Sequence, residues 1–457
     1  MPPRLAISIL FLRASEKVSW VEALERPQDD LRWKVALGLE REEEPKSTLQ
    51  EFEARWVIPE KGETLWKKSM AEARRAGSRQ SRQMRVALDT TPIWGQGAVK
   101  DTSHLLGEGM EPLACRWAEG EGESGASWAE RQGLSRYVSR SLQGEAAMDG
   151  DDQKQRPQWL TARVQDARRL LGLAAEAQAA HPEPAEARGA AAALRERWLA
   201  QEVEEKPEGG CPIQEGTEKD RVVRVADPEM RHGPQSARFN GHQAAVAVER
   251  DSPLIRGVEV LAGNAGDQEK ALDLVPQSER VREAEGVETV GDGAYGGGPT
   301  RRALADEERG LTAKVPASSK GGCFPKRELV SDLEKKAVRC PAGQTTRAYH
   351  AAGDGEGGHC VLAAAVCAAC GWRSPGVRGK GPRTLTIPAE EGLPQRARAH
   401  HPTAAGRKSL RERGVVEHRI ARWVQLGIGR SRYLGRTKTR LQVVMAAVVA
   451  NLSLVVG

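Results

Sequence analysis

The hydrophobic residues of the first 80 positions recur three and four residues apart in the segments WVEALERP, LRWKVALGL and STLQEFEARWV. This spacing places the apolar side chains on one face of a helix. Ser47 and Thr48 precede Glu51 at the spacing of a capping box, which favours a helix start in the third segment. Residues 1–80 are therefore predicted to form a helical domain of mixed charge.

Hydrophobic and polar residues alternate in the next segment, MRVALDTTPIW, which contains β-branched side chains and stops at the glycines of GQG. Such a segment predicts a strand, so residues 81–104 are interpreted as the first core strand and the loop after it. Asp89 follows the apolar run Val86 to Leu88, where the strand is expected to end. An ionisable side chain leaves the core there, which marks Asp89 as a candidate for chemistry.

Residues 105–216 are rich in Ala, Glu, Arg and Gln. Within QWLTARVQDARRLLGLAAEA the helical spacing returns in one apolar face made by Leu160, Val164, Ala167, Leu171 and Ala174. The glycines and prolines of PEGGCPIQEG are typical of a linker. We therefore expect a helical insertion followed by a linker.

Strand and helix patterns alternate over residues 217–316. The expected order is three strands, a helix, a strand, a helix and a strand, given by DRVVRVADP, QAAVAVE, LIRGVEVLAG, residues 267–282, GVETVGD, TRRALADEE and LTAKVPA. This order implies an α/β fold with helices packed on a mixed sheet. Glycines and cysteines interrupt the pattern over residues 317–392, and residues 393–457 are again helical, with one helix expected around 408–425.

The net charge of +6 is small for 457 residues, so only local charge can distinguish a partner. Eleven Lys or Arg stand between Arg407 and Arg440, against the acids Glu412 and Glu417. We interpret this imbalance as a polyanion-binding surface, with a solvated helix face as the alternative.

The last seventeen residues, LQVVMAAVVANLSLVVG, carry no charge and reach the lower limit of a membrane span. Gln442, Asn451 and Ser453 interrupt them, which favours a buried closing helix; a protein with a C-terminal span is the alternative. The N-terminal AISILFL is followed by charges without a small-residue cleavage site, so we also expect a buried helix there.

Five of the seven cysteines fall between Cys323 and Cys370. So few cysteines in a chain of this length indicate a reducing, cytoplasmic compartment. Cys367 and Cys370 have a zinc-like CxxC spacing, and Cys340 with Cys360 or His359 would complete a structural site. Free thiols are the alternative, because structural zinc sites are almost always four-coordinate.

Three carboxylates stand out by position: Asp89 and Asp292 at expected strand ends and Glu417 within a helix. Strand ends are where open sheets build their sites. Three converging acids suit a pair of Mg²⁺ or Mn²⁺ ions, which activate the attacking oxygen and stabilise the leaving one in displacement at phosphorus. Each acid alone is more often merely solvated, so the hypothesis depends on the set.

Several stretches together resemble a known family. They are ALDTTPIWGQGAVKDT, ADPEMRHGPQSARFNGHQAAVAV, VLAGNAGDQEKALDLV, VGDGAYG, RCPAGQTT with VCAACGWR, and VVEHRIARWVQLGIGRSRYLGRTKTRLQVVMAAVVANL. In this order the chain resembles bacterial insertion-sequence DDE transposases of the IS1182-type group. The resemblance begins abruptly at PPRLAISILFL, which implies a shortened N-terminal region.

The resemblance implies a ribonuclease-H-like mixed sheet with a helical insertion, a Cys-containing insertion and an N-terminal helical DNA-binding region. It implies that Asp89, Asp292 and Glu417 form a triad binding Mg²⁺ or Mn²⁺. Arg413, four residues before Glu417, is the expected phosphate or carboxylate partner. Lys100 and Asp101 are further charges expected near the site.

The implied activity is metal-dependent cleavage at element ends and strand transfer into target DNA by a nucleoid-associated homodimer or larger oligomer, without a membrane partner. The expected DNA contacts are the bases after the triad, Arg419, Arg422, Arg430, Arg432, Arg436, Lys438 and Arg440. Leu410 replaces a common tyrosine and Gln243 a common lysine, so the alternative is a catalytically decayed remnant that only binds DNA.

Overall fold

The structure is a computed structural model. It describes residues 2–39, 48–56, 59–77, 83–97, 99, 102–138, 155–180, 199–202, 220–234, 239–282, 287–317, 324–353, 357–372 and 381–456. Lys100 and Asp101 lie outside these residues.

The described part of residues 2–77 contains the helices α1 (Pro3–Glu16), α2 (Trp20–Asp29), α3 (Leu31–Leu37), α4 (Thr48–Trp56) and α5 (Pro59–Arg75), and the apolar spacing predicted α2, α3 and α4. The first four pack around Ile9, Leu10 and Trp33, and against Leu441 and Met445 of the last helix. The fifth belongs to the main core, where the Trp66 indole donates to the carbonyl of Ile255 at 3.1 Å. The expected N-terminal domain is thus joined to the core through α5.

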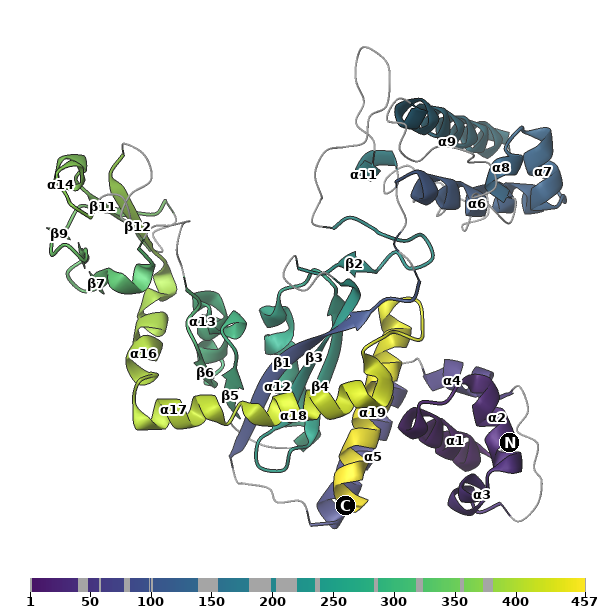
Figure 1. Cartoon of the computed structure of the whole chain (residues 1–457), viewed down its shortest axis with the longest axis horizontal. Coiled ribbons are helices and arrows are strands. Elements are labelled where there is room, and N and C mark those ends of the chain that lie inside the picture. Colours follow the sequence, from purple (N-terminus) through teal and green to yellow (C-terminus); the bar gives the residue numbers. More distant parts are fainter. Residues whose placement is uncertain are drawn as a thin grey trace.

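A six-stranded mixed sheet forms the centre (Figure 1). Its strands are β1 (Met84–Trp94), β2 (Arg231–His232), β3 (Asn240–Glu249), β4 (Ile255–Ala262), β5 (Val287–Gly291) and β6 (Gly310–Ala313). The strand order is β2-β3-β1-β5-β6, with β4 also paired to β3. Strand β1 is antiparallel to β3 and parallel to β5, which is parallel to β6.

Helices cover both faces of this sheet. The main hydrophobic core joins one face, including Ala87 and Val246, to α5, α18 (Gly414–Trp423) and α19 (Arg436–Val456). The other face packs through Val86 and Leu88 on η2 (Asp267–Lys270), α12 (Ala271–Arg282), η3 (Ala294–Gly296) and α13 (Gly298–Asp306). The predicted α/β fold is therefore confirmed as a mixed sheet with helices packed on it.

One predicted strand is wrong. The segment DRVVRVADP forms no strand, and β2 is a two-residue strand after it. The Val222 backbone bonds the side chain of Gln201 in place of a neighbouring strand. The Gln201 carbonyl accepts from the Val222 amide at 2.7 Å, and the Gln201 amide donates to the Val222 carbonyl at 3.1 Å. Val222 itself is buried among the helices of the insertion.

Residues between β1 and β3 include a separate helical cluster, at the upper right in Figure 1. Its helices are α6 (Thr102–Gly120), α7 (Gly125–Arg131), α8 (Ser135–Val138), α9 (Gln155–Ala180) and α11 (Ala200–Glu202). The predicted apolar face is buried at Val164, Ala167 and Leu171.

The cysteine-containing segment forms two small antiparallel sheets, at the upper left in Figure 1. Its elements are η4 (Lys326–Glu328), β7 (Val330–Asp332), β8 (Ala337–Arg339), β9 (Thr345–Thr346), β10 (Tyr349–Ala351), β11 (Gly358–Leu362), α14 (Ala364–Ala368) and β12 (Arg383–Ile387).

The chain returns to the central sheet through η5 (Ala389–Glu391), α16 (Gly392–His400) and α17 (Ala404–Arg411). The single helix predicted around 408–425 is wrong, because α17 ends before Glu412 and α18 begins at Gly414. A π-helical segment, Val424–Ile428, follows α18. Glycine at position 414 favours a break, since it is a poor residue for a helix interior.

Helix α19 is long and apolar enough to meet the length and composition criterion for a membrane span, and 56% of its most apolar window is buried in the fold. A core helix meets the same criterion, and α19 packs on α5 and β4. Its polar residues bond to core backbone groups: the Asn451 amide group donates to the Ile255 carbonyl at 3.0 Å and accepts from its N–H at 2.9 Å.

Candidate active site

Asp89 and Asp292 are brought side by side by the parallel pairing of β1 and β5. The last paired residues are Ala87 and Val290, so each aspartate lies two residues beyond the pair. Neighbouring strands are about 4.8 Å apart, and residues in register point to the same face. Contrary to the prediction, Asp89 does not end β1, because pairing with β3 continues to Trp94.

Asp89 lies in a charged and partly buried environment. Its Oδ1 accepts from the Thr90 amide at 2.8 Å and its Oδ2 accepts from Arg413 Nη1 at 3.1 Å. Burial raises the pKa of the Asp89 carboxyl; the Thr90 amide and Arg413 oppose this rise, and the negative charges of Asp292 and Asp267 add to it. A cation placed there would relieve the repulsion between these carboxylates.

Arg413 is the N-cap residue of α18 and links two of the predicted triad members. One of its terminal nitrogens bonds Asp89, and the other bonds Glu417, which is in the first turn of α18. The Glu417 side chain is 56% exposed, compared with 19% for Asp89. The structure therefore places Glu417 next to Asp89 through a guanidinium bridge.

Asp267 is a fourth acid at this edge and was not predicted from the sequence. It begins η2 after β4, and its Oδ1 accepts from the Thr90 hydroxyl at 2.6 Å. The sequence contains a pattern that could have identified it, because Asp267 follows the apolar strand segment LIRGVEVLAG by four residues.

Tyr295 lies beneath the same carboxylates. Burial raises the pKa of its hydroxyl well above the ordinary value, and the charges of Asp267, Asp89 and Asp292 raise it further. Its buried hydroxyl oxygen forms no hydrogen bond with the described residues. The phenol therefore stays protonated, with a donor available on the protein side of this acidic edge.

The donor chemistry of the site fits a hard cation, because carboxylate oxygens are the ligands that Mg²⁺ prefers. However, no group of three or more His, Cys, Asp or Glu side chains within the described ranges is arranged to hold a metal ion. Arg413 supplies the positive charge between Asp89 and Glu417 in this arrangement.

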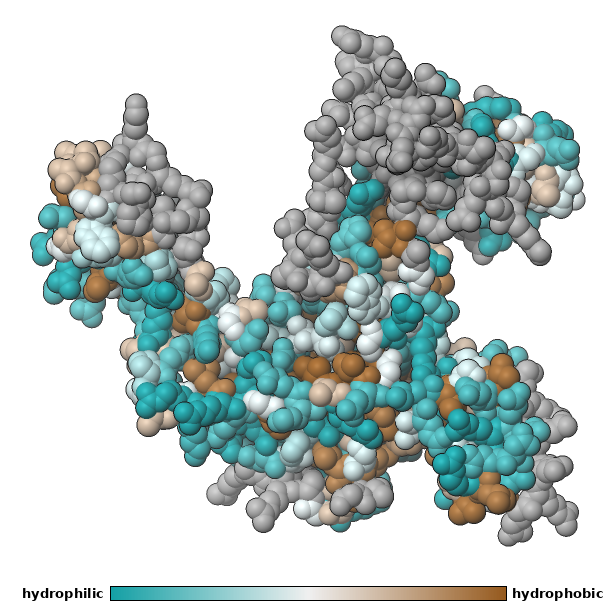
Figure 2. Space-filling view, in the orientation of Figure 1, coloured by the Kyte–Doolittle hydropathy of each residue, from teal (hydrophilic) through white to brown (hydrophobic). Residues whose placement is uncertain are grey.

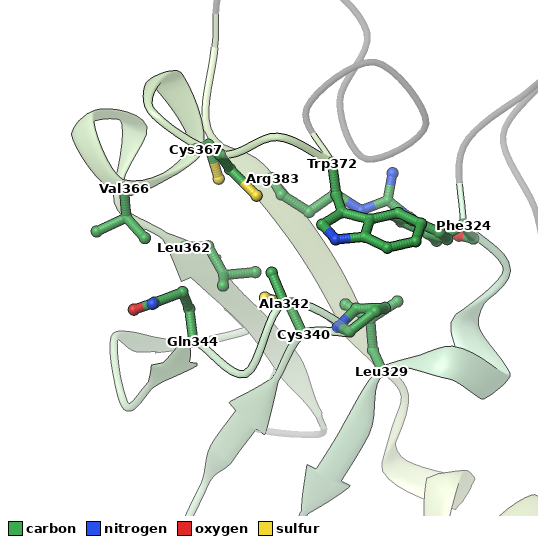
Figure 3. Close-up of a pocket in the computed structure, with 12 residues that line it drawn as sticks. Phe324, Leu329, Cys340, Ala342, Gln344, Leu362, Val366, Cys367, Trp372 and Arg383 are labelled. Atoms are coloured by element: carbon green, nitrogen blue, oxygen red, sulfur yellow. The ribbon is translucent and has the colours of Figure 1, made fainter.

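Cys340, Cys367 and Cys370 line one apolar cavity with Phe324, Leu329 and Trp372 (Figure 3). All three are free thiols, and they form no metal-binding group with other described side chains. Cys360 is fully buried, and burial raises the pKa of its thiol. His359 instead stacks on His350, with ring centroids 5.1 Å apart. Cys360 packs in the same hydrophobic cluster as Cys340 and Cys367, but neither Cys360 nor His359 lines the cavity.

The predicted DNA-contacting bases have two different environments. Arg419 is buried, donates to the Ala450 carbonyl at 2.7 Å, and has its pKa lowered to about 10 by burial and by Arg422. Arg432 bonds the Lys17 carbonyl at 3.2 Å. Arg436 pairs with Glu229 and Arg440 with Glu259, each at 2.9 Å. These four arginines already bond other parts of the fold.

Arg422, Arg430 and Lys438 are exposed and form no ion pair within the described part of the chain. They are the members of the predicted set whose charge is open to a partner.

Residues 339–456 match the family model described as "Transposase DDE domain". The match covers about a quarter of the chain and includes Arg413 and Glu417, whereas Asp89 and Asp292 precede it. This segment is thus similar to a transposase DDE domain. No curated protein matches the chain, and no solved structure matches it.

Proposed function

We propose that the protein is a DDE transposase that cleaves DNA at the ends of an insertion element and transfers the freed strand into target DNA. One observation carries this proposal. Arg413, within the segment similar to a transposase DDE domain, bonds Asp89 of the central sheet at 3.1 Å, and Asp89 and Asp292 each lie two residues beyond the last β1–β5 pair. The family-like segment and the two strand acids therefore contribute to one site.

In this proposal Asp89, Asp292 and Glu417 would hold the divalent cations. When bound, Mg²⁺ or Mn²⁺ supplies Lewis acidity to the attacking and leaving oxygens of the phosphate. Arg413 then turns one guanidinium nitrogen from a carboxylate to a phosphate oxygen, for which its planar fork is suited. Both reaction steps are in-line displacements at phosphorus.

The finer assignments also belong to this proposal. The order of antiparallel and parallel strands supports a ribonuclease-H-like core, and the quoted motifs support the IS1182-type group. Arg422, Arg430 and Lys438 contact DNA phosphates, and α1–α4 contribute to recognition of the element ends. The protein acts as a homodimer or larger oligomer on cytoplasmic, nucleoid DNA. A structural zinc ion at Cys340, Cys367 and Cys370 would require a fourth ligand.

The test is incubation of the full chain with labelled DNA from the regions flanking its reading frame, with Mg²⁺ or Mn²⁺. We expect nicked product from the parent and from the exposed-surface control Lys335→Gln, and none from Asp292→Ala. Equal nicking by Asp292→Ala would show that the triad assignment is wrong.

The second candidate function is a decayed transposase that binds DNA without cutting it. It is favoured by the ion pairs of Arg413, which already engage the Asp89 and Glu417 carboxylates, and by Leu410 and Gln243. A parent protein that binds flanking DNA but yields no nick with either metal would establish this alternative.

A further inference from the structure

A basic groove lies next to the candidate active site, between the end of β6, η4 and the helices α16 and α17. It is a cavity of about 580 Å³, and its charged or titratable lining residues are Lys314, Lys326, Arg327, Arg398, His401 and Arg407. None of the described residues that line it is acidic. The surface over α16 and α17 is largely hydrophilic in Figure 2.

The pairing of β5 with β6 places one residue of this groove, Lys314, near Asp292. The parallel pairing of β5 and β6 matches Gly291 with Ala313, and Asp292 and Lys314 are the next residues of the two segments. Asp292 and Lys314 each follow the last residue of their strand, so both lie with Asp89 at the same edge of the sheet. At the other wall, Leu410 of α17 lines the groove three residues before Arg413.

The positive charge of the groove is only partly neutralised by the protein. Glu391, which is buried, bonds Lys326 and accepts from Arg398 at 3.2 Å. Lys314 and Arg327 are exposed and form no ion pair among the described residues, and Arg407 donates to the Pro402 carbonyl at 2.5 Å. Three exposed bases thus remain without an acidic partner.

The positive surface extends beyond this groove. A second cavity, of about 310 Å³, shares His401 with it and is lined by Arg301, Arg309, Arg396 and His400. Arg301 is buried against backbone carbonyls and Arg309 pairs with Glu279 and Glu307, so Arg396 and His400 supply its exposed basic groups. The pKa of His401 is lowered first by burial and then by Arg301, with His400 and Lys314 contributing. An extended row of positive charge suits a polyanion better than one small anion, because each phosphate of a strand can meet a different base.

We propose that the basic groove binds the phosphodiester backbone of the DNA strand that reaches the row of acids at Asp292. This inference rests on the proposed function, since it takes DNA as the substrate of that site. The groove differs from the surface of Arg422, Arg430 and Lys438, because it adjoins β6 and α17.

The test measures DNA binding by the full chain without divalent metal, so that it is independent of cleavage. Fluorescence anisotropy with a labelled duplex bearing a single-stranded end is followed over a range of KCl concentrations. The variant is K314Q/R327Q/R407Q, and the control R131Q/R302Q/K335Q removes the same charge from exposed positions outside both cavities. Thermal melting verifies that each variant is folded. If the triple variant is unfolded, the single variant R327Q replaces it in the binding test.

We expect the groove variant to lower the slope of log affinity against log salt by about 3, since each duplex phosphate contact contributes about 0.9, and R327Q by about 1. The control should keep the parental slope. Equal slopes for the groove variant and the control, or no DNA binding by the parent, would overturn the proposal. Displacement of DNA by inorganic phosphate beyond that by KCl of equal ionic strength would indicate a small-anion site and also overturn it.

The two proposals can fail separately. If the parent never nicks DNA and the groove variant has a lower slope of log affinity against log salt, catalysis is refuted and DNA binding by the groove is supported. A parent that nicks DNA, combined with unchanged slopes in the groove variant, refutes the groove and leaves catalysis standing.

Discussion

Arg413 Nη1 lies 3.1 Å from Asp89 Oδ2, and this ion pair joins positions 324 residues apart in the sequence. The same guanidinium bonds Glu417. Arg413 therefore links the α17–α18 junction to β1 and contacts two candidate metal ligands.

Replacing Arg413 with Gln should lower the rate of metal-dependent nicking by about 10²- to 10³-fold, the usual cost of removing one donor that stabilises developing charge. Lysine should restore only part of the rate, because an ammonium group cannot bond two oxygens in the planar geometry of a guanidinium. Single-turnover nicking assays measure both variants. A rate for Arg413→Gln equal to that of the parent would show that Arg413 does not act on the substrate.

Arg250 should be a positioning residue for the same junction. It follows β3, its side chain is 4% exposed, and it bonds Glu412, the residue before Arg413, and approaches Glu288 of β5 at 3.8 Å. Arg250→Gln leaves these carboxylates without their cation, so we expect a loss of about 3 kcal/mol in the free energy of unfolding, measured by urea denaturation.

The matched control is Arg302→Gln, which breaks an exposed pair with Asp306 and should cost less than about 0.5 kcal/mol. Similar losses for the two variants would indicate that Arg250 contributes no more than a surface charge.

Asp89→Asn should make the protein more stable at neutral pH while removing activity. The pKa of Asp89 is raised mainly by burial, so folding favours the protonated carboxyl. For an acid whose pKa is raised by folding, stability is greatest at low pH and decreases as pH rises from the unfolded pKa through the folded pKa. The stability that Asp89→Asn gains over the parent should therefore be greatest above the folded-state pKa of Asp89 and should decrease in acid. Chemical denaturation at several pH values tests this, and a gain that grows on acidification would contradict it.

The thiols should react in an order set by exposure and pKa. The thiolate is the reactive form, so Cys360, which is buried and has a raised pKa, should react more slowly with a thiol reagent than Cys340, Cys367 and Cys370. Mass spectrometry of the modified peptides gives the order. Zinc that copurifies at one ion per chain and protects all three cavity cysteines would show a complete metal site instead.

The sequence predicted the elements of the sheet better than the side chains around it. Short apolar runs located β3 and β4, because their apolar residues face the core on both sides of the sheet. The strand expected at Val222 is wrong because its burial is against the helical insertion, and an apolar run does not identify the packing partner. Asp89 was selected for leaving the core, yet β1 continues past it because only the pairing with β5 stops.

The charged residues show a second limit of the sequence. Arg419 and Arg430 both belong to one basic run, but Arg419 caps a carbonyl inside the core and Arg430 is exposed. The count of bases cannot separate these roles, since it contains no information on which side of a helix meets the sheet. Asp267 was missed for the reverse reason: its contact with Thr90 depends on the pairing of distant strands.

The most direct measurement is metal-directed cleavage of the polypeptide backbone. Fe²⁺ in place of Mg²⁺, with ascorbate and peroxide, generates radicals that cut the chain near the bound ion. If Asp89 and Asp292 share a cation, cuts should occur near both residues, disappear in excess Mg²⁺, and be lost at both places in Asp292→Ala. Cuts that are absent from both segments, or that persist unchanged in Asp292→Ala, would contradict a shared metal site at this edge of the sheet.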